Sequence, residues 1–220
     1  MLTVIPTPIG NLQDITLRAL EALREADVIA AEDTRHSGIL LHHHGISKPM
    51  VSFHEHNEAG KTAVLVEEIA QGRKVALITD AGMPGISAPG FRLVRACRER
   101  DLPVTVLPGP SAVVTALAGS GLPSDSFYFG GFLPVKSGQR RNELEAAIAR
   151  EETSIYFESP YRLAKSLGVL AEVAPEASVC VARELTKKFE EYRRGKPAEL
   201  AVHYDAHPPK GEITLLISNK

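Results

Sequence analysis

Short β-rich runs alternate with segments of helical periodicity along the chain, and this alternation limits the possible folds more than any other feature. Apolar residues three or four positions apart predict helices, whereas short apolar runs between them predict strands. The expected strands span residues 2–6, 28–31, 51–53, 75–79, 104–107, 127–132, 154–157, 179–182 and 212–217. Regular alternation of this kind is typical of α/β folds, so the sequence predicts an α/β protein.

Turn-forming residues cluster in the segment 119–126, between two regions of regular periodicity. A chain of 220 residues is long enough for two domains of ordinary size. We interpret the segment as a linker. The sequence thus predicts an N-terminal α/β domain of residues 1–118 and a C-terminal α/β domain of residues 127–220.

Composition limits the class of protein and its partners. Apolar residues make up 44% and charged residues 24%, as in ordinary globular proteins. The net charge of −2 gives no overall basic field, so a nucleic acid would have to be held by a local patch. Cys97 and Cys180 lie in apolar-periodic segments, which predicts reduced core residues. We find no signal peptide and no apolar run of about 18 residues, so we expect a cytoplasmic protein without a membrane span.

Three glycine- and proline-rich loops, residues 6–11, 80–85 and 108–112, each follow an expected strand of the first half. Ligands of open α/β sheets bind at the carboxyl ends of the strands, where such loops meet. Ordinary strand-to-helix turns are the alternative for each loop taken alone. None has the spacing of a phosphate-binding loop or a dinucleotide-binding fingerprint, which disfavours nucleotide hydrolysis and Rossmann-type redox chemistry.

Histidines give only weak support for a metal site. The run His42–His44 lies on an expected helix, where three consecutive side chains cannot face one ion. His54 and His56 are expected to share one face of a strand, with Glu58 nearby. No ligand set with zinc spacing accompanies them, so we favour a polar wall and expect no metal.

Charged runs stand after further expected strands, at residues 32–36, 158–162 and 183–188, and a basic stretch occupies residues 136–141. Strand ends are where reactive groups collect in α/β proteins, and basic side chains there can bind phosphates. Helix caps and structural ion pairs explain the same runs equally well. Position alone leaves both interpretations open.

Eight segments resemble one family when they are taken in order: PTPIGNLQDIT, AEDTRHS, HEHNE, ITDAGMPGISAPG, LPGPSA, GFLP, FESPYR and ARELTKKFEE. The family is the small-subunit ribosomal RNA (cytidine-2′-O)-methyltransferase I group of the tetrapyrrole methylase superfamily. The family pattern SDAGTP-x-ISDPG reads TDAGMPGISAPG here, with Met83 and Ala88 at the differing positions. Many relatives also continue beyond the closing strand, so we expect weaker RNA binding if that extension contributes.

The resemblance implies two α/β domains with S-adenosyl-L-methionine in the cleft between them, and a homodimer. It also implies methylation of a cytidine ribose 2′-oxygen in the decoding region of 16S rRNA in the small ribosomal subunit. Carried over by position, the cofactor wall comprises Pro8, Asp80, Met83, Ser111, Ala112, Phe157 and Ala182.

The same matches place charged residues on the substrate side. A ribose hydroxyl is a poor nucleophile, so a general base would add about 10²–10⁴-fold to the rate. The candidate bases are Asp33 and Glu32, followed by Glu158, and we expect Asp33→Asn to reduce turnover with cofactor affinity nearly unchanged. The candidate RNA contacts are Arg35, Arg183, Lys187 and Arg140.

Two other functions remain open. A methyltransferase for a tetrapyrrole or another small molecule would need an apolar acceptor pocket, which a chain with no Trp and 5% aromatic residues does not favour. A protein that binds S-adenosyl-L-methionine without catalysis is the second alternative.

Overall fold

The computed structural model describes the whole chain, Met1–Lys220, as two compact units, Met1–Ser111 and Ala112–Lys220. Each unit contains one five-stranded sheet with helices, as the α/β prediction requires. The division falls earlier than the boundary expected from the sequence. Helix α5 (Ala112–Ser120) packs against strands of the second sheet, and the segment expected as a linker lies inside the second unit, where Gly119 packs directly on the Tyr192 ring.

The first sheet is entirely parallel, with the strand order β3-β2-β4-β1-β5. Its strands are β1 (Leu2–Val4), β2 (Val28–Ala31), β3 (Met50–Ser52), β4 (Val75–Ile78) and β5 (Val104–Val106). Its helices are α1 (Leu17–Glu25), α2 (Thr34–His43), α3 (Glu58–Ala70) and α4 (Phe91–Glu99), with a short 3-10 turn, η1 (Leu12–Asp14). The hydroxyl of Thr16 accepts the Ala19 N–H and caps α1, as predicted.

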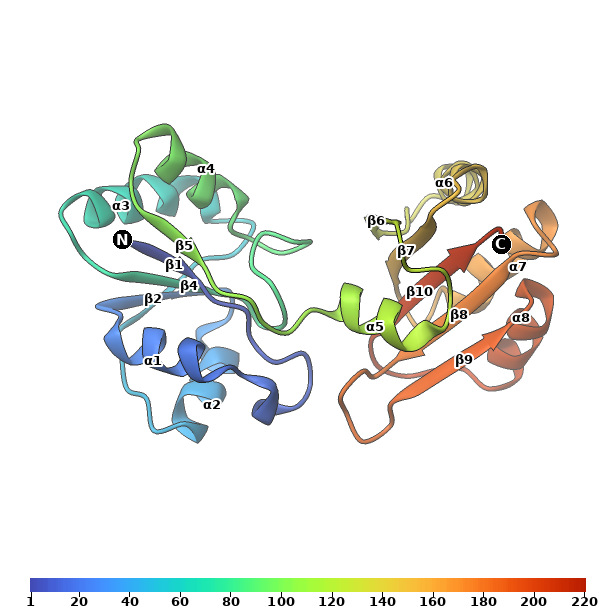
Figure 1. The fold of residues 1–220 in the computed structure, drawn as a ribbon, viewed down its shortest axis with the longest axis horizontal. Helices are drawn as coiled ribbons and strands as arrows, with labels where there is room; N and C mark the ends of the chain where they lie inside the picture. Colours follow the sequence, from blue (N-terminus) through green and yellow to red (C-terminus); the bar gives the residue numbers. More distant parts are fainter. The chain divides into compact units, whose positions relative to one another are not determined.

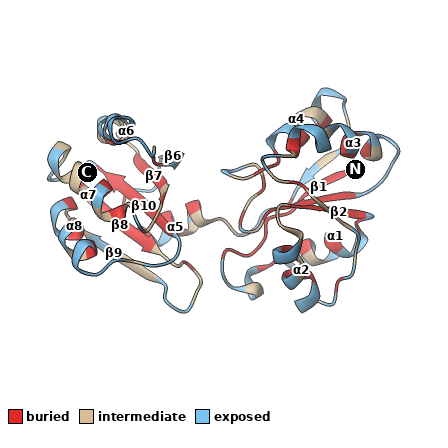
Figure 2. Cartoon of the chain, turned by 180° about the vertical axis from the view of Figure 1, so that it is seen from behind, coloured by how far each residue is buried: buried red, intermediate tan, exposed pale blue.

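Helices cover both faces of this sheet (Figure 1). One apolar cluster joins the strands to α1 and α2 through residues such as Leu23 and Leu40. A second cluster joins the opposite face to α3 and α4 through residues such as Leu65 and Leu93. Because both faces are covered, β2 and β4 are buried along their whole length, which Figure 2 shows for β2.

The second sheet is mixed, with the strand order β6-β7-β10-β8-β9. Only β6 and β7 run parallel, and the other neighbours are antiparallel. Its strands are β6 (Phe127–Phe132), β7 (Thr153–Glu158), β8 (Ser178–Arg183), β9 (Glu191–Gly195) and β10 (Ile213–Ser218). Its other helices are α6 (Ser137–Ala149), α7 (Leu163–Val173) and α8 (Pro197–Ala206).

The two faces of the second sheet are covered differently. The main apolar cluster joins one face to α6, α7 and α8, with Val181 and Leu215 at its centre. Helix α5 packs on the other face, because Tyr192 pairs with Ala182 in the sheet and its hydroxyl donates to the Thr115 carbonyl at 3.1 Å. The sheet therefore has a thick helical side and a second side covered by α5.

Several further expectations can be compared with the structure. Cys97 and Cys180 are free and buried, as predicted. The expectation that His54 and His56 share a strand face is wrong, because β3 ends at Ser52 and His54 begins a turn closed by the Asn57 side chain. Strand β9 and helix α8 were not predicted. No helix combines the length and apolar character needed to cross a bilayer.

Candidate functional site

The carboxyl ends of the first sheet form one edge, because all five strands run parallel. From this edge β1 connects to α1 on one face of the sheet, whereas its neighbour β4 connects to α4 on the opposite face (Figure 1). Adjacent strands whose connections leave on opposite faces open a crevice in which α/β proteins bind ligands. The loops after β1 and β4 carry Pro8, Asp80 and Met83, three of the expected cofactor residues.

The three glycine- and proline-rich loops contact one another directly, as predicted. Thr7 and Gly82 exchange backbone hydrogen bonds of 3.0 Å in both directions, which joins the loops after β1 and β4. The third loop reaches the first at Gly109, where an added Cβ would lie 2.8 Å from Cγ of Pro6. Only glycine permits this approach. We call these three loops, residues 6–11, 80–85 and 108–112, the strand-end loops.

Three carboxylates stand on the same edge. Glu32 and Asp33 follow β2, and Asp80 follows β4. The Asp33 N–H donates to Oδ1 of Asp80 at 3.1 Å, and the Asp80 N–H donates to Oε2 of Glu32 at 3.3 Å. These crossed contacts fix the three residues, the strand-edge carboxylates, relative to one another. Their negative charge favours a cationic group at this edge.

Glu32 and Asp33 differ in basicity although they are adjacent. Burial raises the pKa of Glu32, and the Asp80 charge adds to that effect. The Arg35 guanidinium, bonded to Asp33 at 2.8 Å, holds the pKa of Asp33 well below its usual range. Asp33 also caps α2 by accepting the Arg35 N–H at 2.8 Å. Of the two, Glu32 is the stronger proton acceptor, and its Oε1 has no hydrogen bond.

Glu58 has a structural role that the sequence does not predict, since its position there indicates only a neighbour of the histidines. The side chain is buried, and its Oε1 accepts the N–H groups of Gly90 and Arg92, each at 3.1 Å. It thereby fixes the start of α3 to the end of the loop after β4 and to the first turn of α4. The structure contains no group of three His, Cys, Asp or Glu side chains placed to hold a metal ion.

The expected cofactor residues of the first unit and of the start of α5 differ in how far they are buried. Pro8 is buried beside the Thr7–Gly82 bridge, and Met83 is half-buried against the α3–α4 cluster. Ser111 and Ala112 are half-buried where the first unit ends and α5 begins.

Phe157 and Ala182 are brought onto one face of the second sheet, since Thr214 of β10 pairs with both. Phe157 is half-buried and its ring contacts those of Phe129 and Phe132 at 5.0 and 5.4 Å between centroids. Ala182 is fully buried. The Phe157 side chain is therefore partly accessible, whereas Ala182, two strands away, is closed to solvent.

Glu158 points to the opposite face, because successive side chains of a strand alternate. There the carboxylate is fully buried and forms a 2.6 Å ion pair with Arg162. It also accepts the Ser159 N–H at 2.6 Å and the Ser166 hydroxyl at 2.5 Å. With all these donors in place Glu158 has no free position for a substrate proton, so the geometry favours a structural role over the predicted catalytic one.

Arg140 also has a structural role in this geometry. Its side chain is buried, and its guanidinium donates to the Val135 carbonyl at 3.2 Å. A phosphate has no access to a group in that position. Arg140 is therefore not available as an RNA contact. Arg35, by contrast, has a side chain that is 91% exposed and can reach an external ligand.

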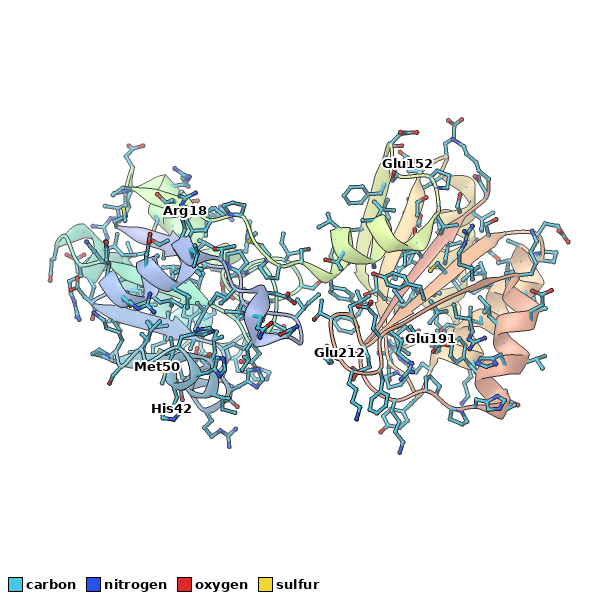
Figure 3. The ribbon with its side chains drawn as sticks, turned by 60° about the horizontal axis from the view of Figure 1, so that its bottom comes forward. Arg18, His42, Met50, Glu152, Glu191 and Glu212 are labelled. Carbon is cyan, nitrogen blue, oxygen red and sulfur yellow. The ribbon has the colours of Figure 1, made fainter.

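Arg183 and Lys187 belong to a group of alternating charges at one end of the second sheet. Arg183 pairs with Glu191 at 3.2 Å, and Lys187 pairs with Glu184 at 2.8 Å and with Glu212 at 2.9 Å. Arg193 completes the group by pairing with Glu191 at 2.6 Å. Figure 3 labels Glu191 and Glu212 at this end. We call these six residues the paired-charge cluster.

The cluster holds as many carboxylates as cations. Burial alone would raise the pKa of Glu184, but the hydrogen bonds from Lys187 and from the Glu212 N–H, together with the charges of Lys187 and Arg183, outweigh it and lower the pKa. The same pairing raises the pKa of Lys187 against the opposing effect of burial. Phosphate binding here would have to displace existing carboxylate partners, so these cations are weaker RNA contacts than their positions in the sequence predict.

Comparison with known proteins agrees with the fold. The profile of the family described as Tetrapyrrole (Corrin/Porphyrin) Methylases matches residues 1–201. A Mesorhizobium japonicum protein named "Ribosomal RNA small subunit methyltransferase I" is 51% identical over 98% of this chain and 74% of its own length. A Thermotoga maritima protein of the same name is 43% identical over 100% of this chain and 98% of its own.

Solved structures of low sequence identity share the fold. Diphthine synthase superposes with a TM-score of 0.74 at 15% identity, over 99% of this chain and 89% of that one. Uroporphyrin-III-C-methyltransferase from Thermus thermophilus superposes with a TM-score of 0.68 at 23% identity, over 99% of this chain and 94% of that one. From the profile match and the full-length relatives, we conclude that the chain belongs to the tetrapyrrole methylase family.

Proposed function

We propose that this chain transfers a methyl group from S-adenosyl-L-methionine to a cytidine ribose 2′-oxygen of 16S rRNA in the small ribosomal subunit. The observation that carries the proposal is the identity of 43–51% to relatives named for small-subunit ribosomal RNA methylation, over nearly the whole chain. A ribosomal substrate implies a cytoplasmic location, which belongs to the proposal. A homodimer remains a prediction.

The residues present fit a sulfonium cofactor. The strand-edge carboxylates provide negative charge for its positive centre, and the strand-end loops beside them are held together by the Thr7–Gly82 bridge and by the contact of Gly109 with Pro6. We propose that Pro8, Asp80 and Met83 of the first unit hold the cofactor, and Phe157 stays a predicted cofactor contact. When bound, S-adenosyl-L-methionine supplies an activated methyl group together with its own leaving group.

In the proposed reaction Glu32 acts as the general base. Its Oε1 is free to accept the proton of a ribose hydroxyl, and its raised pKa improves the match to that task. Asp33 is a positioning residue, because its carboxylate holds both the start of α2 and the Arg35 guanidinium. Arg35 is then fixed near the base, where an exposed guanidinium can bind a phosphate of the substrate.

Methyl transfer to defined acceptors tests the proposal. Purified protein is incubated with methyl-labelled S-adenosyl-L-methionine and, separately, small subunits lacking the modification, large subunits, and a tetrapyrrole. We expect label in small-subunit RNA alone. Label in the tetrapyrrole would show a small-molecule enzyme, and cofactor binding without transfer to any acceptor would show a protein that binds without catalysis.

A further inference from the structure

A cavity of about 530 Å³ lies in the second unit and is lined by none of the candidate catalytic or cofactor residues. Its walls are the start of α7, the end of α8 and the loop 208–211 that leads into β10. The volume falls in the range of pockets that bind small ligands or single groups of larger ones. The mechanism proposed above does not use this cavity.

The lining combines flat apolar groups with free positive charge. Tyr161 is 93% exposed and lines the cavity together with Pro208 and Pro209. Lys165 and Lys210 are exposed and take part in no ion pair, against a single acidic side chain, Asp205. This differs from the paired-charge cluster, in which every cation already has a carboxylate partner. The cavity therefore has net positive charge available to an anion.

Both walls of the cavity are held firmly. Pro160 and Tyr161 follow Glu158, whose buried contacts with Ser159, Arg162 and Ser166 anchor the start of α7. Across the cavity, Gly211 packs so closely on Glu184 that any Cβ would overlap its carboxylate. The Lys210 carbonyl also accepts a 3.3 Å hydrogen bond from Arg183. A site whose walls are fixed in advance loses less entropy when a ligand binds.

We propose that this cavity binds one unpaired nucleotide of the RNA substrate, with its base stacked on Tyr161 and its phosphates at Lys165 and Lys210. The assignment rests on the proposed function for the identity of the RNA. An exposed aromatic ring beside free lysines is the combination that proteins use to hold single-stranded RNA. Because stacking tolerates any base, the cavity contributes affinity and does not read sequence.

The test measures the dissociation constant of a fluorescent single-stranded RNA oligonucleotide by anisotropy, at several salt concentrations. Tyr161→Ala is expected to raise Kd roughly 5- to 150-fold, the loss of one base–aromatic stack, while Tyr161→Phe keeps near-normal affinity. Lys165→Ala and Lys210→Ala are each expected to reduce the salt slope of log Kd by about 0.7. In methyl transfer to small subunits the same variants raise KM and leave kcat unchanged.

Lys61→Ala is the matched control, since Lys61 is an exposed lysine of the first unit without an ion pair. If Tyr161→Ala and the two lysine variants bind RNA like this control, the proposal is wrong. The affinity for cytidine monophosphate is measured in the same way. If it depends on Tyr161 and the oligonucleotide binds no more tightly than the mononucleotide, the cavity binds a free nucleotide and the proposal is also wrong. Should the wild type transfer no methyl, the proposed function fails, and the oligonucleotide series still decides the role of the cavity.

Discussion

Two glutamates at the ends of strands, Glu32 and Glu158, illustrate how the two units differ. Glu32 follows β2 of the parallel sheet, accepts one hydrogen bond of 3.3 Å and keeps Oε1 free. Glu158 ends β7 of the mixed sheet, where Arg162, Ser159 and Ser166 all bond to a fully buried carboxylate. Both positions looked like site edges in the sequence. The comparison teaches that hydrogen-bond partners, and not strand-end position, decide whether a carboxylate is available for chemistry.

The largest effect on activity is expected for substitution of Glu32, whose Oε1 has no hydrogen bond. Glu32→Gln should lower kcat about 10²–10⁴-fold, the contribution of a general base. The reaction needs the ionised carboxylate, so the wild-type rate falls as pH drops through the raised pKa of Glu32. The variant should lack this acidic limb in its kcat–pH profile. An unchanged profile and rate would assign the base elsewhere.

Substitution of Glu158, which pairs with Arg162, should lower the stability of the protein instead. Glu158→Ala leaves Arg162 without its buried partner, so the free energy of unfolding in urea should fall by about 3–5 kcal/mol. The matched control is Glu99→Ala, which breaks the exposed Arg95–Glu99 pair and should cost less than about 1 kcal/mol. A normally stable Glu158→Ala protein without activity would contradict the distinction between the two glutamates.

The close approach of the strand-end loops can be tested at Gly109. Gly109→Ala forces a methyl group against Pro6, and overpacking of this kind costs about 1–3 kcal/mol. If the loops hold the cofactor together, the affinity for S-adenosyl-L-methionine measured by calorimetry should fall about 5- to 100-fold. Gly138→Ala is the control, because nothing lies within 4 Å of an added Cβ there. Equal affinities for the two variants would separate Gly109 from the cofactor site.

The smallest effect is expected at Asp33. Asp33→Asn removes the charge that holds Arg35 but retains an oxygen that can cap α2, so turnover should fall about tenfold or less through Arg35. Arg35→Ala should reproduce that loss, and the double variant should lose no more than either single one. A loss as large as that of Glu32→Gln would make Asp33 the base.

The pairing of Asp33 also predicts a pH effect on stability. The pKa of Asp33 is lower in the folded protein than in the unfolded chain. Its ionised carboxylate therefore contributes to the free energy of unfolding at pH values above the pKa of the unfolded chain. That contribution disappears as pH falls through the pKa of the folded protein. Thermal unfolding of the wild type should therefore lose that contribution in acid, whereas Asp33→Asn should show less acid dependence. Identical profiles would contradict the Asp33–Arg35 pairing.

Most strands and helices could be predicted because their apolar periodicity reports burial directly. Strand β9 could not, since its sequence EYRRG has no apolar run. It is held by its ladder with β8 and by ion pairs such as Arg183–Glu191, which are tertiary features. Helix α8 did carry a local signal, with Pro197 at its start and Glu199 accepting the Lys196 N–H.

The site was predictable in part for a similar reason. Loops at the ends of parallel strands must converge, so the contacts of Thr7, Gly82 and Gly109 follow from the predicted fold. Side-chain partners do not follow in this way, so the sequence does not predict the buried bonds of Arg140 and leaves the ion pairs of Lys187 as one of two open interpretations. Strand alternation could have shown that Phe157 and Glu158 face opposite sides and cannot share one site.

The position of the transferred methyl group tests the central claim most directly. Small subunits methylated by the wild-type protein are digested to nucleosides, and the labelled nucleoside is identified by mass spectrometry, with Glu32→Gln in parallel. We expect 2′-O-methylcytidine as the only labelled product, formed at a strongly reduced rate by the Glu32→Gln variant. A methyl group on a base, or an equal rate for Glu32→Gln, would contradict the central claim.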